Sequence, residues 1–384
     1  MKVDLADTTT SGIAAALVSA RRHSGSPAMG MVFTVVIVVD EADQHDAMIA
    51  ASGAAQEHPA RVLGVILRGG RGPSRLDAEV RVGGEAASGE SVLMRFHGEL
   101  ARHAESVVMP LLLPESPVVA WWPGRPPTSL YADPIGALAQ RRVADTAAVA
   151  RPLSVLRHLC ANYVPGDTDL AWTRLTPWRA LLAAALDQHP AKVASTVVEA
   201  SRGNASATLL ATWLSQRLHA PARITESKGP GITAVRMYVP KGEIAITRPD
   251  GRLAQYSVPG QPVRHVALKR RTTAELLAEE LRRLDPDDIY ANTVKEYLAG
   301  FDARATSKAA ARVTTPVAHT DVTGPLPSKK TAAKKASATK KAPTTKKTVR
   351  AKKTAATKTS AAKKTSAAEK TPTKKAVPTK KPAR

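Results

Sequence analysis

The feature that most constrains this chain is an abrupt change in composition near residue 302. All fourteen aromatic residues lie at or before Phe301, whereas 303–384 consists mainly of Ala, Lys, Thr, Ser, Pro and Val. Of the 56 Lys and Arg residues, 23 lie from Ala303 onward, with 2 of the 33 acidic residues. This segment therefore carries +21 of the net charge of +23, and 1–302 is nearly neutral. Because such a composition cannot bury enough apolar surface to fold, we expect a folded part over 1–302 and a disordered basic tail over 303–384.

The tail contains eight Lys-Lys pairs, often six residues apart. Lysine side chains bind phosphates by releasing counterions, without reading bases, but no aromatic residue is interleaved with them for base stacking. Two interpretations stay open. The tail is either a solvated polycation without a partner, or an arm that contacts DNA or another polyanion. The lysines expected to make that contact are Lys329, Lys330, Lys334, Lys335, Lys340, Lys341, Lys346, Lys347, Lys352 and Lys353.

Composition also excludes several classes of protein. Cys160 is the only cysteine, which rules out an intramolecular disulfide and a thiolate metal site within one chain and fits a reducing compartment. The N-terminal residues do not resemble a signal peptide. The longest apolar runs, such as 35–39, are far shorter than the roughly 20 residues of a membrane helix. We expect a cytoplasmic protein with no membrane contact, and Cys160 as a small core residue.

The first 150 residues alternate between β-branched apolar runs and Ala-rich segments. A continuous apolar run at 31–39 is typical of a strand covered on both faces, and a helix at 41–57 and a second buried strand at 61–67 follow it. This order predicts a parallel crossover unit. We therefore predict a layered α/β domain with a mostly parallel sheet over 1–150. Further strands are expected at 76–82, 91–97, 118–122 and 143–147, and helices at 11–22 (with Ile13, Leu17 and Val18 inward), at 98–108 and from Asp133.

Residues 151–302 predict an α+β domain. Period-two alternation recurs in four short segments separated by Pro-Lys-Gly, Pro-Asp-Gly and Pro-Gly turns, which indicates an antiparallel meander of about four strands. Thr272 and Glu275 have the spacing of a capping box at the start of a helix, and a last helix is expected to end near Ala299. The meander strands are expected at 232–239, 243–247, 252–258 and 263–269, after helices at 153–162, 177–188 and 205–218 and a strand at 192–200.

No catalytic signature is present. The segment Gly69-Gly70-Arg71-Gly72-Pro73 lacks the Gly-Lys-Ser/Thr ending of a phosphate-binding loop, so a flexible connection is its default interpretation. The ten histidines are scattered, without zinc spacing or a Ser/His/Asp grouping. We predict no catalytic residues, no metal and no cofactor.

Two clusters of polar and aromatic residues are not explained by core packing alone. In the Trp121-Trp122 pair, adjacent strand residues face opposite sides, so either both indoles are buried or one is a docking anchor. Arg141, Arg142 and Asp145 are expected to follow a helix as a solvated end, a contact surface or an anion site.

The second cluster lies in the central stretch GDTDLAWTRLTPWRALLAAALD at 166–187. Its second half predicts a core helix that begins at Thr176-Pro177. Its first half crowds acids, an indole and an arginine into a short lead-in, which is a candidate contact or ligand surface. The candidate partner-binding residues of both clusters are Trp121, Trp122, Asp133, Arg141, Arg142, Asp145, Asp167, Asp169, Trp172, Arg174 and Arg179.

The chain resembles the actinobacterial branch of the OpcA family, the glucose-6-phosphate dehydrogenase assembly proteins. The resemblance covers 1–300 and does not include the tail. The stretches that carry it are VDLADTTT at 3–10, EHPARV at 57–62, RLDAEVRVG at 75–83, LARHAESVVMPLLLP at 100–114, PVVAWWPG at 117–124, DPIGALAQRRVAD at 133–145, the central stretch at 166–187 and LAEELRRLDPDDIY at 277–290.

The resemblance implies a non-catalytic partner that glucose-6-phosphate dehydrogenase needs to reach its active oligomeric form, in support of the oxidative pentose-phosphate pathway and NADPH supply. Two alternatives stay open beside it. One is a nucleic-acid-associated protein that uses the lysine tail. The other is a protein with an unrecognised sugar-phosphate site at Arg141, Arg142 or Arg179.

Overall fold

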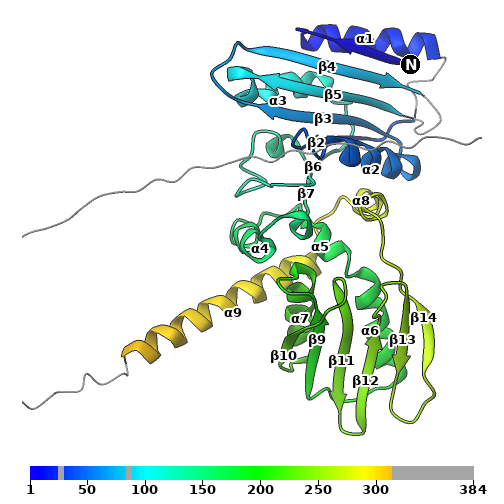
Figure 1. The fold of residues 1–384 in the computed structure, drawn as a ribbon, viewed down its shortest axis with the longest axis vertical. Helices are drawn as coiled ribbons and strands as arrows, with labels where there is room; N and C mark the ends of the chain where they lie inside the picture. Colours follow the sequence, from blue (N-terminus) through cyan, green and yellow to red (C-terminus); the bar gives the residue numbers. More distant parts are fainter. Residues whose placement is uncertain (25–29, 84–88, 314–384) are drawn as a thin grey trace, which may run out of the picture. The chain divides into compact units, whose positions relative to one another are not determined.

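The computed structural model of this chain describes residues 1–24, 30–83 and 89–313, which contain two β-sheets and the helices around them (Figure 1). The first sheet has the strand order β1-β4-β5-β3-β2-β6-β7-β8. Its pairs are parallel from β5 through β8, and β4 pairs antiparallel with both β1 and β5. Its strands are β1 (Lys2–Leu5), β2 (Phe33–Val38), β3 (Ala60–Arg68), β4 (Arg75–Val82), β5 (Glu90–His97), β6 (Val118–Trp122), β7 (Arg141–Ala144) and β8 (Asp167–Asp169).

Helices cover the central strands on both faces, as the continuous apolar runs predict. One face packs against α1 (Thr10–Ser24) and α3 (Ala104–Val108), and Trp122 is buried in that core. The other face packs against α2 (Gln44–Glu57) and α8 (Thr273–Arg282), and Trp121 is buried there. Both indoles are 1% exposed, so the pair alternates across β6 without presenting either ring to solvent.

The second sheet has the order β10-β9-β11-β12-β13-β14. The predicted meander is confirmed, because β11 to β14 pair antiparallel in succession, and β9 pairs antiparallel with β11 and parallel with β10. The elements of this region are α4 (Pro152–Ala161), α5 (Leu170–Thr173), α6 (Thr176–Gln188), β9 (Ser195–Ala200), α7 (Ala205–Leu218), β10 (Ala222–Glu226), β11 (Ile232–Val239), β12 (Gly242–Thr247), β13 (Leu253–Ser257), β14 (Arg264–Ala267) and α9 (Asp288–Val313).

The two regions share elements across the boundary that we placed at residue 150. Strand β8 completes the first sheet, although it lies in the predicted second domain. Helix α8 begins at the predicted capping box of Thr272 and Glu275 and packs on the first sheet beside α2. Residues from both predicted domains therefore build the first sheet and its cover.

Several local predictions are wrong. The segment 98–108 is a 3-10 turn at Gly98–Arg102 followed by α3, and His103 between them leaves the helical path with a φ of −123° and a ψ of 29°. Asp133 caps only a short turn, η3 (Gly136–Leu138). Strand β7 then begins at Arg141, so Arg141 and Arg142 belong to a strand. Val18 is 41% exposed instead of facing inward.

The last helix, α9, passes both its expected end near Ala299 and the predicted start of the tail at Ala303, and ends at Val313. Residues 314–384, with all the Lys-Lys pairs, lie outside the described residues. Cys160 is buried in the core of the second region, as predicted, and burial raises the pKa of its thiol to about 12.

Candidate functional site

Most of the predicted partner-binding residues lie inside the protein, where β7, β8, α5 and α8 meet. We call this set the junction network: Arg141, Arg142, Asp145, Asp167, Asp169, Thr173, Arg174 and Glu280. Its charged groups come from segments far apart in sequence and, apart from Asp169, pair with one another, as the following contacts show.

Arg141 of β7 pairs with Glu280 of α8. Its Nε and Nη2 both donate to Glu280 Oε2, and its Nη1 donates to the carbonyl oxygen of Asp285 at 2.9 Å. The other carboxylate oxygen of Glu280 accepts from the hydroxyl of Thr173. The Arg141 and Glu280 side chains are 4% and 6% exposed. This fully bonded pair fixes α8 to the edge of the first sheet.

Arg142 and Asp167 are register partners on β7 and β8, and their side chains pair across the two strands. Arg142 also donates to the carbonyl oxygens of Ala139 and Pro165, both at 2.7 Å. Gly166 has a φ of 98°, and a Cβ there would lie 2.5 Å from the Gln140 carbonyl oxygen. The turn into β8 therefore requires glycine, and it closes directly over the arginine.

Asp145 and Asp169 lie at the carboxyl ends of β7 and β8. Asp145 accepts both terminal nitrogens of Arg174, at 2.7 and 2.8 Å. Asp169 caps α5 by accepting from the Ala171 amide at 2.8 Å, and it also accepts from the Thr146 amide. Burial, and then the charge of Asp145, raises the pKa of Asp169 to about 6. No cation in the described part of the chain pairs with Asp169, which makes it the one unmatched acid of the network.

Trp172 connects this network to α9. Its Nε1 donates to Asp287 Oδ2 at 2.8 Å, and the Arg179 guanidinium lies 3.9 Å from the centre of its ring. The indole itself is 1% exposed. Among the candidate residues, Asp133, Arg174 and Arg179 are only partly buried. The other candidate side chains have no surface to offer a partner in this conformation, and a partner-binding role for any of them stays a prediction.

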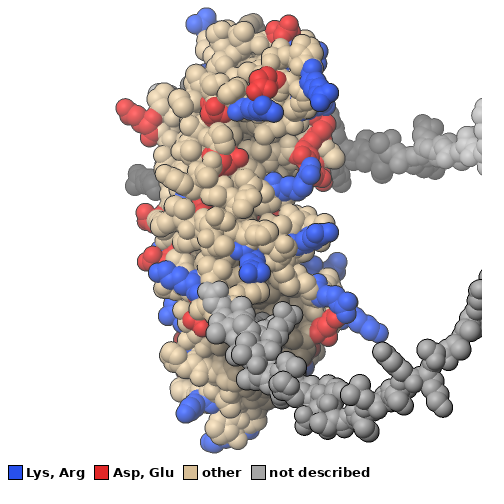
Figure 2. Space-filling view, turned by 90° about the vertical axis from the view of Figure 1, so that its left-hand side faces the viewer, with Lys and Arg blue, Asp and Glu red and all other residues tan. Residues whose placement is uncertain are grey.

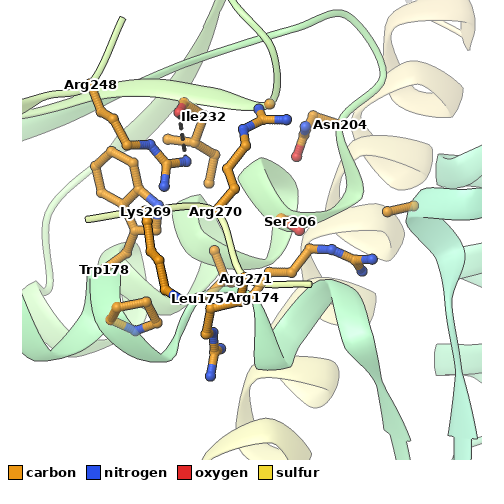
Figure 3. A pocket seen from close by; sticks show the side chains of 13 residues that line it. Arg174, Leu175, Trp178, Asn204, Ser206, Ile232, Arg248, Lys269, Arg270 and Arg271 are labelled. Carbon is orange, nitrogen blue, oxygen red and sulfur yellow. Dashed lines mark hydrogen bonds between the residues drawn. The ribbon is translucent and has the colours of Figure 1, made fainter. Parts of the chain in front are cut away.

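A second site was missed from the sequence. A cavity of about 320 Å³, which we call the basic pocket, opens where α5, α6 and α7 meet the second sheet (Figure 3). Its wall contains five basic side chains and no acidic one: Arg174, Arg248, Lys269, Arg270 and Arg271, with Ala147, Leu175, Pro177, Trp178, Asn204, Ser206, Gly231 and Ile232.

Arg248 is buried in this wall without a carboxylate partner. The residue is 6% exposed, its Nη1 and Nη2 donate to the carbonyl oxygens of Leu268 and Ile232 at 2.8 and 3.3 Å, and its Nε has no hydrogen-bond partner within the described ranges. Its guanidinium lies 5.0 Å from the centre of the Trp178 ring. Burial, and then the nearby charge of Arg270, lowers the pKa of Arg248 to about 10, although Asp250 opposes this.

Arg270 follows β14 and reaches into the same wall. Two glycines make room for its side chain: a Cβ on Gly231 would lie 2.5 Å from Arg270 Nη2, and a Cβ on Gly251 would lie 3.0 Å from its Nε. Both glycines have positive φ, 67° and 75°. In the structure as described, no ion pair or side-chain hydrogen bond holds the Arg270 guanidinium.

The other basic side chains of the pocket are paired. Lys269 Nζ lies 2.7 Å from Glu275, Arg271 pairs with Glu279 and donates to the carbonyl oxygen of Thr173, and Arg174 pairs with Asp145. Arg174 therefore belongs both to the pocket wall and to the junction network. The net excess of positive charge comes from Arg248 and Arg270.

The sequence held a weak signal of this pocket in the run Lys269-Arg270-Arg271 between the last meander strand and the capping box. The arginines that we proposed for a sugar-phosphate site do not line it. Arg141 and Arg142 are paired with Glu280 and Asp167 in the junction network, and Arg179 stacks on Trp172. Over residues 1–24, 30–83 and 89–313, no group of His, Cys, Asp and Glu could hold a metal ion, and no helix there is long and apolar enough to cross a membrane.

Solved structures give only weak likenesses. The 3-ketoreductase KijD10 from Actinomadura kijaniata is 9% identical, with a TM-score of 0.40, over 71% of this chain and 97% of that chain. A dehydrogenase from Clostridium difficile is 5% identical, with a TM-score of 0.38, over 71% and 99%. An oxidoreductase from Sinorhizobium meliloti is 12% identical, with a TM-score of 0.36, over 72% and 89%. TM-scores this low carry no conclusion about fold or activity.

Family models give a specific result, whereas no curated protein matches the chain. The model of the glucose-6-phosphate dehydrogenase subunit N-terminal domain matches residues 51–161. The model of the C-terminal domain of the same subunit matches residues 165–294. The two matches meet in the loop before β8, at the junction network. Because together they match more than half of the chain, this protein belongs to the OpcA family of glucose-6-phosphate dehydrogenase subunits.

Proposed function

We propose that this chain is a non-catalytic subunit that binds glucose-6-phosphate dehydrogenase and promotes its assembly into the active oligomer. It thereby supports the oxidative pentose-phosphate pathway and NADPH supply in the cytoplasm. The observation that carries the proposal is the match of both family domains in order along one chain. The enzyme is the partner, and the chemistry belongs to the enzyme.

The junction network supports this proposal from the side of structure. Its acids and arginines are mostly bonded to one another and buried, which suits a rigid scaffold better than an active site, where groups must be free to meet a substrate. Residues 1–302 are also nearly neutral in net charge. On the face in Figure 2, basic and acidic side chains are interspersed over the described residues. Docking is therefore expected to depend on shape and local contacts.

Asp133, Arg174 and Arg179 are the candidates that we propose as direct contacts, because only their side chains are partly exposed. The buried candidates, including both tryptophans of β6, are proposed to act by holding the docking surface in shape. Under this proposal, Arg179→Ala weakens the complex with the dehydrogenase while the protein stays folded. Unchanged affinity would remove Arg179 from the contact.

The main test uses purified dehydrogenase and the full chain. Addition of the chain is expected to raise the rate of NADP⁺ reduction and to shift the enzyme to a larger assembly by light scattering. An equal mass of an unrelated soluble protein is the control. If a saturating excess leaves both the rate and the mass of the enzyme unchanged, the proposal is wrong.

The charge of +21 over residues 303–384 favours a second candidate function, which is contact with DNA or another polyanion. Because α9 reaches Val313, the matched variant ends at Val313 and not before Ala303. The full chain is expected to bind immobilised DNA with a steep salt dependence, and the shortened variant to elute without delay. Equal elution of the two proteins at low salt would exclude the tail as a polyanion-binding arm.

A further inference from the structure

The basic pocket holds an electrostatic arrangement that is unfavourable while it is empty of anions. Arg248 and Arg270 carry like charges close enough for one to lower the pKa of the other, and neither has a carboxylate partner among the described residues. Burial keeps water from solvating the Arg248 charge fully, whereas Arg270 is exposed, so solvent screens part of the repulsion between the two. Buried arginines elsewhere in the chain, such as Arg141 and Arg142, each pair with a carboxylate, so the missing partner of Arg248 is an exception among them. A bound anion would remove the imbalance.

The Arg248 guanidinium is held in place before any ligand arrives, whereas Arg270 is exposed and no hydrogen bond or ion pair in the described part of the chain holds its guanidinium. Carbonyl oxygens of β11 and of the segment after β14 fix Arg248, and its planar group lies over the Trp178 ring. The Arg270 side chain lies against Gly231 and Gly251, where a Cβ would come within 2.5 and 3.0 Å of it. In Figure 3 the side chains of Arg248 and Arg270 appear on either side of Ile232. Planar guanidinium forks match the oxygens of a phosphate group.

The start of helix α7 adds a third source of positive charge to the pocket. Asn204 caps α7, a helix of 14 residues, and Asn204 and Ser206 line the pocket. The first turn of a helix presents amide N–H groups and the positive end of its dipole, which favours anions. The apolar side chains Leu175, Pro177 and Trp178 form another part of the wall. A cavity with a few convergent polar groups and apolar walls is typical of a small-molecule site.

We propose that the basic pocket binds a small phosphorylated metabolite. The phosphate group lies between Arg248 and Arg270 at the start of α7, and the rest of the molecule contacts the wall formed by Leu175, Pro177 and Trp178. The volume of about 320 Å³ suits a sugar phosphate or a molecule of similar size. The site belongs to this chain alone and does not rest on the proposed function.

Calorimetric titration of the full chain tests the proposal at constant ionic strength, with glucose 6-phosphate, inorganic phosphate and glucose as probes. Glucose 6-phosphate is expected to bind saturably with one molecule per chain, inorganic phosphate more weakly, and glucose not at all. Arg270→Gln is expected to weaken glucose 6-phosphate binding at least tenfold, and Arg270→Lys to an intermediate degree, because it keeps the charge but loses the fork.

The matched control is Arg252→Gln. Arg252 is exposed and does not line the pocket, so its loss removes one positive charge without touching the site. All variants keep the lysine tail, and any binding to the tail is therefore common to all. Identical isotherms for the wild type, Arg270→Gln and Arg252→Gln would overturn the proposal. Equal affinity for glucose 6-phosphate and inorganic phosphate would overturn the claim that the body of a metabolite contacts the wall.

Melting temperatures separate a ligand-binding role from a structural one. If Arg270 serves the ligand, Arg270→Gln relieves repulsion, and its melting temperature without ligand stays equal to that of the wild type or rises. Glucose 6-phosphate then raises the melting temperature of the wild type, since it binds only the folded state, and not that of the variant. A melting temperature of unliganded Arg270→Gln well below that of the wild type would assign Arg270 to structure and contradict the proposal.

Discussion

The junction network and the basic pocket both contain buried arginine, Arg141 and Arg142 in the network and Arg248 in the pocket, yet they use it in opposite ways. Arg141 and Arg142 each meet a carboxylate and backbone carbonyls. Arg248 meets only carbonyls, and no acid compensates Arg270 in the described part of the protein. Matched buried charge fixes neighbouring segments to one another, whereas unmatched charge in a recess is available to a ligand. The two regions therefore differ in whether their buried arginines meet a carboxylate, and not only in the number of arginines.

Removal of one partner from the junction network is expected to have the largest effect. Glu280→Gln leaves Arg141 buried without a counter-charge, and loss of a partner from such a pair costs about 3–5 kcal/mol. Chemical denaturation, followed by circular dichroism, measures this loss. Glu296→Gln on the exposed side of α9 is the control and is expected to change the free energy of unfolding by less than about 0.5 kcal/mol. A loss below about 1 kcal/mol for Glu280→Gln would show that the pair does not hold the junction together.

Asp169 lets the effect of a missing counter-charge be measured inside the junction network, because it is the acid there that pairs with no cation in the described part of the chain. Burial raises its folded-state pKa to about 6, well above the ordinary value for an aspartate, so the folded state binds the proton more tightly than the unfolded state. The contribution of Asp169 to the free energy of unfolding is therefore greatest below pH 4. It falls by about 3 kcal/mol as the pH rises to 6. Asp169→Asn keeps an acceptor for the Ala171 amide and should remove this fall.

Free energies of unfolding at pH 4 and pH 7, for the wild type and Asp169→Asn, give the contribution of Asp169 by difference. The subtraction cancels the titration of other groups. A wild type that gains stability relative to Asp169→Asn over this range would reverse the sign and disprove the assignment.

Gly166→Ala is expected to have the next largest effect. The new Cβ meets the Gln140 carbonyl oxygen and Arg142 Nη2 at a φ of 98°, so strain and a displaced arginine together cost about 1–3 kcal/mol. The control is Gly260→Ala, which shares a positive φ of 76° but has open space around it. Thermal melts of both variants measure the difference. Equal losses would mean that backbone strain alone acts and that packing over Arg142 contributes nothing.

Arg270→Gln is expected to have the smallest effect and the opposite sign. Loss of the repulsion on Arg248 should stabilise the unliganded protein by about 0.5–1 kcal/mol, within the range of other stabilising surface-charge changes. Denaturation in a buffer free of phosphate and sulfate measures the gain, because either anion would occupy the pocket of the wild type. A loss of stability on the scale of Glu280→Gln would erase the distinction between the two regions.

The sequence predicted what local patterns specify. The parallel crossover at β2, α2 and β3, the meander from β11 to β14 and the capping box of α8 all depend on residues close together in the chain. These were predicted from periodicity and turn residues, and the structure confirms them.

The partners of buried charges could not be predicted in this way. Arg141 and Glu280 are 139 residues apart, and the sequence around one gives no indication that the other is its partner. The residues of the basic pocket likewise come from several separate turns of the chain. Arg141-Arg142 was therefore expected after a helix, as a solvated end, a contact surface or an anion site, and no role was predicted for Arg248 or Arg270. The spacing of Gly231 and Gly251 acquires meaning only after the fold brings Arg270 between them.

Arg174 lies in both regions, with its guanidinium bound to Asp145 and its side chain in the wall of the basic pocket. An anion that draws this guanidinium would compete with Asp145, and a protein docked over Arg174 would favour one of the two arrangements. Linkage is reciprocal, so each binding event would change the affinity for the other by the same factor. One shared side chain is thus sufficient to make a metabolite and a protein partner sensitive to each other.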